Sequence, residues 1–74
     1  MPKLPVVSGK VVVKAMAKLN YEVDHQTGSH IILRQSYSPF RRLTVPNHKE
    51  IAKGTLKSIL NQAGISVEVF IELL

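Results

Sequence analysis

The chain contains no cysteine, so it has no disulfide bond, no thiolate nucleophile and no thiol ligand for a metal. No stretch approaches the roughly 20 consecutive apolar residues that a membrane-spanning helix needs. Residues 1–7 carry two prolines and no long apolar core, which argues against a signal peptide. The glycines are isolated and form no glycine-rich phosphate loop. These absences predict a soluble, cytoplasmic protein that binds neither a metal nor a membrane.

Acidic residues are scarce, because five Asp and Glu stand against ten Lys and Arg, which gives a net charge of +5. A basic surface favours an anionic partner, namely RNA, DNA or an acidic protein. The 74 residues are predicted to form a single domain, 1–74. Such a small domain buries only roughly 60% of the surface of its unfolded chain. We therefore expect a site on the surface of a compact scaffold, without a cofactor enclosed in a pocket.

Hydrophobic spacing and turn residues predict an α+β fold with the order α-β-β-β-α and a short extra C-terminal helix. The predicted elements are an extended N-terminal arm at 1–7, a helix capped by Ser8 and ended by Asn20, strands at 21–26, 30–35 and 41–45, a helix from Gly54 or Thr55 to Gly64, and a last helix capped by Ser66. Because the connections are short, we expect a three-stranded antiparallel sheet with the helices on one face.

The predicted core consists of apolar residues at helical or alternating spacing. The first strand is expected to be half buried. The helices and the other two strands are expected to contribute Val12, Ala15, Met16, Leu19, Ile31, Leu33, Leu43, Val45, Leu56, Ile59, Leu60, Ala63, Val69, Phe70 and Leu73. Alternation then leaves the opposite face of the sheet to solvent.

His30 is the first candidate site residue, because it follows the turn Thr27-Gly28-Ser29 and is expected on the solvent face with Arg34 and Arg42. Cleavage of RNA without a metal requires a base for the 2′-hydroxyl proton, an acid for the leaving 5′-oxygen, and cations for the phosphate. His30 could serve as the acid or the base, while the two arginines could hold phosphate with paired hydrogen bonds. The sequence leaves the companion of His30 open among His48, a lysine and water.

Several further residues are candidates for phosphate contact. Gly28 is expected to supply a positive φ in the turn and to let a phosphodiester approach, and Ser29 could bond the turn or a phosphate. Lys53 and Lys57 continue a spacing of four residues near the start of the second predicted helix, where anions are favoured.

For the other histidines and the carboxylates the sequence favours a structural explanation, although His48 stays open as a companion of His30. His48 is expected to be a loop histidine, and His25 to be partly buried or at a strand end. The separations among the three histidines do not match a compact zinc motif. Glu22 and Asp24 share a predicted strand face, but solvated strand charges explain them better than a carboxylate pair for glycoside chemistry.

Three segments taken together carry a resemblance to a known family. They are Gly28-Ser29-His30, Val45-Pro46-Asn47-His48 and residues 53–66, with the sequence KGTLKSILNQAGIS. The chain resembles, from Ser8 to Leu74, the HicA toxin family of toxin–antitoxin pairs. The resemblance implies a fold similar to the double-stranded RNA-binding domain and endonucleolytic cleavage of mRNA, with His30 as the catalytic residue. It also implies a HicB-type antitoxin that covers the active site.

The chain departs from the family pattern in three places. Asn20 stands where a glycine is expected, residues 36–40 replace a shorter polar hairpin, and Val69 stands where an acidic residue is common.

Two other functions remain open from the residues alone. A non-catalytic RNA-binding module predicts salt-sensitive binding without cleavage. A pure interaction domain for an acidic protein predicts negligible affinity for RNA.

Overall fold

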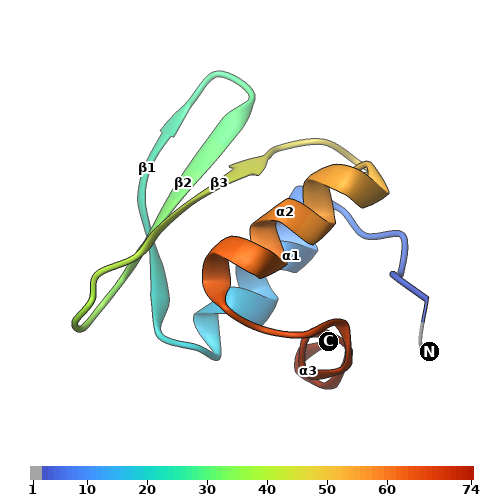
Figure 1. Cartoon of the computed structure of the whole chain (residues 1–74). Coiled ribbons are helices and arrows are strands. Elements are labelled where there is room, and N and C mark those ends of the chain that lie inside the picture. The colour runs from blue at the N-terminus through green and yellow to red at the C-terminus, as the bar shows by residue number, and fades with distance from the viewer. Residues whose placement is uncertain (1–2) are drawn as a thin grey trace.

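A computed structural model describes residues 3–74, so Met1 and Pro2 of the predicted N-terminal arm lie outside the described residues. The elements are α1 (Gly9–Ala17), β1 (Tyr21–Thr27), β2 (His30–Gln35), β3 (Arg42–Pro46), α2 (Lys53–Ala63) and α3 (Val67–Leu73), arranged as in Figure 1. The predicted α+β order is therefore confirmed, with β3 starting one residue later than expected and α2 starting one residue earlier. Within residues 3–74, no helix combines the length and the apolar character that crossing a membrane would require.

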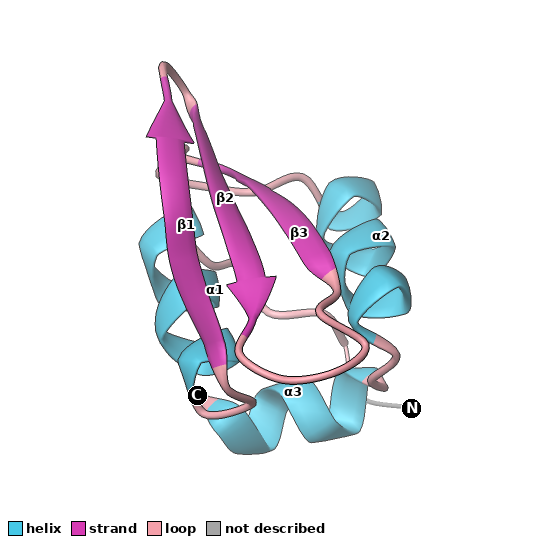
Figure 2. Ribbon diagram, turned by 90° about the vertical axis from the view of Figure 1, so that its left-hand side faces the viewer, coloured by secondary structure: helices cyan, strands magenta, loops and turns pink. Residues whose placement is uncertain are grey.

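The three strands form one antiparallel sheet in the order β1-β2-β3. Figure 2 shows α1 and α2 behind this sheet, with α3 crossing below its lower end. The inward side chains of the two later strands, Ile31, Leu33, Leu43 and Val45, are buried against the helices as predicted. The alternate residues of β2 and β3 face away from the helices, so one face of the sheet is free of the helix layer.

Helix α1 forms as its sequence predicts. The Ser8 side chain caps it by accepting a hydrogen bond from the Val11 amide at 3.2 Å. Val12, Ala15 and Met16 lie on one helical face and are buried in the core. Asn20 ends the segment with a φ of 68°, the left-handed conformation expected there.

Strand β1 differs from its prediction, because Tyr21 is its only buried residue. A β-bulge interrupts the pairing with β2 between Val23 and His25, so the simple alternation of faces fails at that point. Val23 pairs with Leu33 and so faces the helix layer, yet it is 52% exposed at the edge of α1. The half-buried strand predicted from alternation is therefore wrong.

The two C-terminal helices close the core. Gly64 ends α2 in the left-handed conformation with a φ of 74°, and the Arg41 guanidinium donates a hydrogen bond at 3.0 Å to the Ala63 carbonyl, where a cation is favoured. In α3, capped by Ser66, Phe70 is fully buried. The prediction that Val69 is buried is wrong, because the short helix turns it to solvent with 39% of its surface exposed.

Gly9 shows how closely α1 approaches the sheet. Its amide donates a hydrogen bond of 2.9 Å to the His48 carbonyl, just beyond β3. A Cβ atom added at this residue would overlap the Pro46 carbonyl oxygen, which belongs to the backbone and cannot turn away. The first turn of α1 therefore rests directly on the end of β3.

We expect Gly9→Ala to lower the free energy of unfolding by about 1–3 kcal/mol, the usual cost of overpacking. Gly54→Ala is the matched control, because Gly54 is exposed on α2 and a Cβ there would meet nothing within 4 Å. Alanine should stabilise that helix position by about 0.5–1 kcal/mol. Urea denaturation of both variants measures the two effects, and equal stability of the Gly9→Ala variant and the parent would contradict the close contact.

Tyr21 combines burial with a hydroxyl that has no hydrogen-bond partner among the described residues. Burial raises the pKa of Tyr21 above its usual value of 10.0, and the nearby Arg41 charge opposes part of that rise. The folded state therefore holds the phenol proton more tightly than the unfolded state does. The contribution of this group to the free energy of unfolding is fully present below pH 10 and is lost as the pH rises through the raised pKa of Tyr21.

We expect Tyr21→Phe to leave the free energy of unfolding at pH 7 unchanged or higher by about 1 kcal/mol, because an unpaired buried hydroxyl is removed. Above pH 10 the variant should lose less stability than the parent protein. Chemical denaturation at pH 7 and at alkaline pH tests both statements. A large loss of stability at pH 7 would show that the hydroxyl has a partner.

Candidate active site on the open face of the sheet

The strand register fixes which side chains share the solvent side of the sheet, called here the open face. Paired residues of antiparallel strands point to the same side, so the pairing can be read across all three strands. The pairing places on the open face Glu22, His25, Thr27, His30, Ile32, Arg34, Arg42, Thr44 and Pro46. Asp24 has no partner in the register, but its carboxylate contacts His25 and it lines a pocket with Arg34, so it joins the same face. Except for Ile32 and Pro46, which are half-buried, these residues are exposed.

His30 begins β2 at one end of the open face. It pairs with Thr27 on one side and with Pro46 on the other, and it is exposed. The turn before it contains Gly28 with a φ of 47°, and a Cβ at Gly28 would meet nothing within 4 Å. The space in front of this turn is therefore open.

A short hydrogen bond holds the turn in place. The Asn47 amide donates to the Ser29 carbonyl at 2.6 Å, so the hairpin before His30 is tied to the segment that leaves β3. This contact brings together two of the sequence segments that carried the family resemblance, residues 28–30 and residues 45–48. His48 itself is exposed, and its carbonyl is held by α1 through the Gly9 amide.

Two guanidinium groups occupy the other end of the open face. Arg34 and Arg42 are directly paired across β2 and β3, an arrangement that is unfavourable for like charges unless an anion or acid lies near. The Arg34 guanidinium lies 5.7 Å from the centre of the exposed Phe40 ring. Glu22 pairs with Arg34 in the register but accepts its hydrogen bond from the Ser36 hydroxyl at 3.2 Å.

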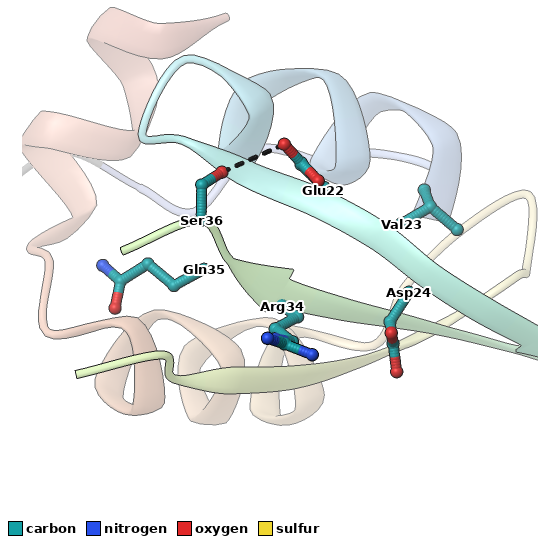
Figure 3. Close-up of a pocket in the computed structure, with 6 residues that line it drawn as sticks. All are labelled: Glu22, Val23, Asp24, Arg34, Gln35 and Ser36. Carbon is teal, nitrogen blue, oxygen red and sulfur yellow. Dashed lines mark hydrogen bonds between the residues drawn. The ribbon is translucent and has the colours of Figure 1, made fainter. Parts of the chain in front are cut away.

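Figure 3 shows the pocket at this end of the face, with a volume of about 320 Å³. Asp24 and Arg34 both line it, from β1 and β2, while Glu22 turns toward Ser36. The pocket is open and mainly polar, and it is lined by groups of both charges. It is suited to a charged polymer lying across the sheet rather than to an enclosed small molecule.

His25 lies elsewhere than predicted. It is neither partly buried in the core nor at the end of its strand, since it sits inside β1 with 51% of its side chain exposed. The bulge pairs it with Ile32 and so places it on the open face. Its Nδ1 lies 3.0 Å from an Asp24 carboxylate oxygen.

The predicted lysines lie apart from this cluster. Lys53 and Lys57 are exposed on α2, whose apolar side packs on the buried face of the sheet. The structure therefore brings Gly28, Ser29 and His30 together at one end of the sheet, with the two arginines further along the same face, and leaves these lysines in the helix layer. Within residues 3–74, no group of three or more His, Cys, Asp or Glu side chains is placed to hold a metal ion.

Sequence reasoning missed two features of the open face. The position of His25 depends on a bulge that no glycine or proline marks in β1. Phe40, whose ring lies 5.7 Å from the Arg34 guanidinium, belongs to the loop before β3 together with Tyr37, and each has about half of its surface exposed. Two aromatic residues beside arginines are a recognisable signal for contacts with nucleic-acid bases, and they could have been singled out from the sequence.

Fold and site together define a small α+β domain that displays histidine and arginine on one open sheet face. A model of the family described as the HicA toxin of bacterial toxin–antitoxin matches residues 9–65. The chain belongs to this HicA toxin family. The match spans α1 to α2 and stops before α3, short of the reach to Leu74 expected from the sequence. A comparison with curated proteins finds no match.

Membership of a toxin family implies an antitoxin as the partner of this chain. The family match also covers the segments that build the open face. The matched region contains the turn at Gly28, the open face and the whole of α2, so every candidate site residue lies inside it. The matched region therefore includes the whole of the open face.

Proposed function

We propose that the protein is the endoribonuclease toxin of a type II toxin–antitoxin system, an mRNA interferase that cleaves mRNA without a metal and so inhibits translation. The observation that carries this proposal is the placement of His30, exposed beside an open glycine turn on a face that also displays Arg34 and Arg42. Family membership supports the toxin function. The net charge of +5 supports a polyanionic substrate.

In the proposed reaction His30 transfers a proton at the scissile phosphate. The 2′-oxygen attacks phosphorus as its proton leaves, the bond from phosphorus to the 5′-oxygen breaks, and that oxygen receives a proton. Arg34 and Arg42 stabilise the phosphates, and a bound anion would offset the repulsion between these paired cations. The scissile phosphate approaches the backbone at Gly28 and Ser29, where the space is open.

The remaining partners follow from the same surface. A HicB-type antitoxin would inhibit the toxin by covering the open face, in the cytoplasm where mRNA is translated. Lys53 and Lys57 would extend the RNA path around the edge of β3 onto α2. The alternative is a non-catalytic RNA-binding module, which would use the same arginines and histidine without bond cleavage.

We expect His30→Ala to reduce cleavage of a long mRNA by roughly 10²–10⁴-fold, the usual contribution of a proton-transfer group. Because His30 is exposed, the variant should keep the fold of the parent protein. Cleavage is measured in EDTA, and circular dichroism checks folding. Glu68→Gln, an exposed change on α3 away from the open face, serves as the control.

Three outcomes distinguish the functions. Cleavage by the parent protein and the Glu68→Gln control, but not by His30→Ala, supports a metal-independent ribonuclease. A folded and fully active His30→Ala variant would remove His30 from the mechanism. RNA binding without cleavage by any of the proteins would favour the binding module.

Two double variants of equal charge test the RNA path. The logarithm of the RNA association constant falls linearly with the logarithm of the salt concentration. Removal of two phosphate contacts, from either pair, should make this slope shallower by about 2. Arg34→Gln/Arg42→Gln should also lower kcat, because these groups hold the RNA strand in position across the face that carries His30. Lys53→Gln/Lys57→Gln should raise KM alone. An unchanged KM and salt slope for the lysine pair would confine RNA to the open face.

A further inference from the structure

We propose that His25 is the second proton-transfer group of the open face and the companion of His30, and that Asp24 holds it for this role. This inference rests on the proposed ribonuclease function and deepens it, because a single histidine leaves either the base or the acid unassigned. It rests on three features of β1: a bulge, a side-chain contact and a register.

The bulge is what brings Asp24 and His25 together. In a regular strand, consecutive side chains point to opposite faces and cannot share a hydrogen bond across the strand. Here the extra residue leaves Asp24 unpaired, while His25 pairs with Ile32. The carboxylate and the ring consequently meet at 3.0 Å between Oδ2 and Nδ1, and they form an ion pair when the ring is protonated.

The register places His25 beside His30. His25 is opposite Ile32, and His30 is two residues before Ile32 on the same strand and the same face. Such diagonal neighbours stand roughly 7–8 Å apart, within reach of long side chains. Both rings are exposed. A spacing of that order suits one phosphodiester between the two imidazoles, and Arg34 is the other diagonal neighbour of His25.

The contact with Asp24 determines which nitrogen of His25 faces the substrate. A carboxylate oxygen only accepts a hydrogen bond, so Nδ1 carries hydrogen and Nε2 is the atom left to exchange a proton. This is the arrangement in which a third group orients a catalytic histidine. Asp24 is thus a positioning residue.

The two histidines divide the reaction between them. A general acid begins as the cation, and the Asp24 carboxylate, 3.0 Å from the His25 ring, can pair with its cation, whereas among residues 3–74 no carboxylate forms an ion pair with His30. His30 therefore takes the 2′-hydroxyl proton, and the 2′-oxygen forms a bond to phosphorus. His25 gives its Nε2 proton to the 5′-oxygen as the phosphorus–oxygen bond breaks. The products are a 2′,3′-cyclic phosphate and a free 5′-hydroxyl, with protons and electrons balanced.

The structure places His48 away from His25 and His30. His48 follows Pro46, and its carbonyl is bound by the Gly9 amide at the start of α1. His48 lines a hollow together with Ser8 and Lys10, which belong to the start of α1. His48 is therefore directed to α1, while His25 is directed to the open face.

A substrate with sulfur in place of the bridging 5′-oxygen tests the assignment. A thiolate leaves without a proton, so this substrate needs the base but not the acid. The matching RNA dinucleotide with oxygen at this position is the ordinary substrate. His25→Ala should cleave the ordinary substrate roughly 10²–10⁴-fold more slowly than the parent protein does, and most of this loss in rate should disappear with the sulfur substrate. His30→Ala should be slow on both substrates, and His48→Ala should match the parent protein on both.

The pH dependence of kcat/KM gives a second measurement. Loss of the acid should remove the fall in rate on the alkaline side of the bell-shaped profile. The charged or titratable groups that share the face with His25 are Glu22, Asp24, His30, Arg34 and Arg42. Asp24→Asn keeps the shape of the positioning residue and removes its charge. On ordinary RNA this variant should lose less of the cleavage rate than His25→Ala does, and the sulfur substrate should restore that rate as it does for His25→Ala.

The outcomes separate the two levels of the proposal. Failure of the parent protein to cleave either substrate overturns the ribonuclease function and this inference with it. Equal kcat for His25→Ala and the parent protein on ordinary RNA overturns the role of His25 alone. A loss of the same size on both substrates would overturn the acid assignment. His25→Gln, polar and close in size at this exposed position, repeats the comparison if the alanine variant is poorly folded.

Discussion

The pairing of β2 with both of its neighbours is the constraint on which the open face depends. Leu33 pairs with Leu43 and Ile31 with Val45, and all four are buried under the helices. A slip of one residue in β3 would turn its two apolar side chains to solvent and drive Arg42 toward the core. The hydrophobic core therefore keeps Arg42 opposite Arg34.

The bulge in β1 is the one local exception to this regular register, and it has two linked consequences. It interrupts the alternation that would bury half of β1, and it places Asp24 and His25 on the same face. Because β1 is an edge strand, the extra residue disturbs only one ladder of hydrogen bonds. An irregularity here can redirect side chains without altering the pairing of β2 with β3.

Most of the fold could be predicted from the sequence because its determinants are local. Ser8 and Ser66 mark helix starts, Gly64 marks a helix end, and alternation in β2 and β3 sorts core from solvent correctly. The failures depend on pairing or packing. The bulge exists only against β2, and the exposure of Val69 depends on how the short α3 sits under the core. Likewise, the spacing of Lys53 and Lys57 could not show that α2 lies on the other side of the sheet from His30.

Under the proposed function, the open face would allow so small a protein to be both active and open to inhibition. A thin core leaves no room for an enclosed pocket, so the groups of the proposed mechanism project from a sheet whose backbone fixes their order: the glycine turn, His30, then the two arginines. Under the proposed function, RNA that lies along this order would meet the proton-transfer group and the cations together. An antitoxin that presents carboxylates to Arg34 and Arg42 would occupy the same surface. Substrate and inhibitor would then compete for the same pair of cations. The repulsion between the two arginines would favour the binding of either anionic partner.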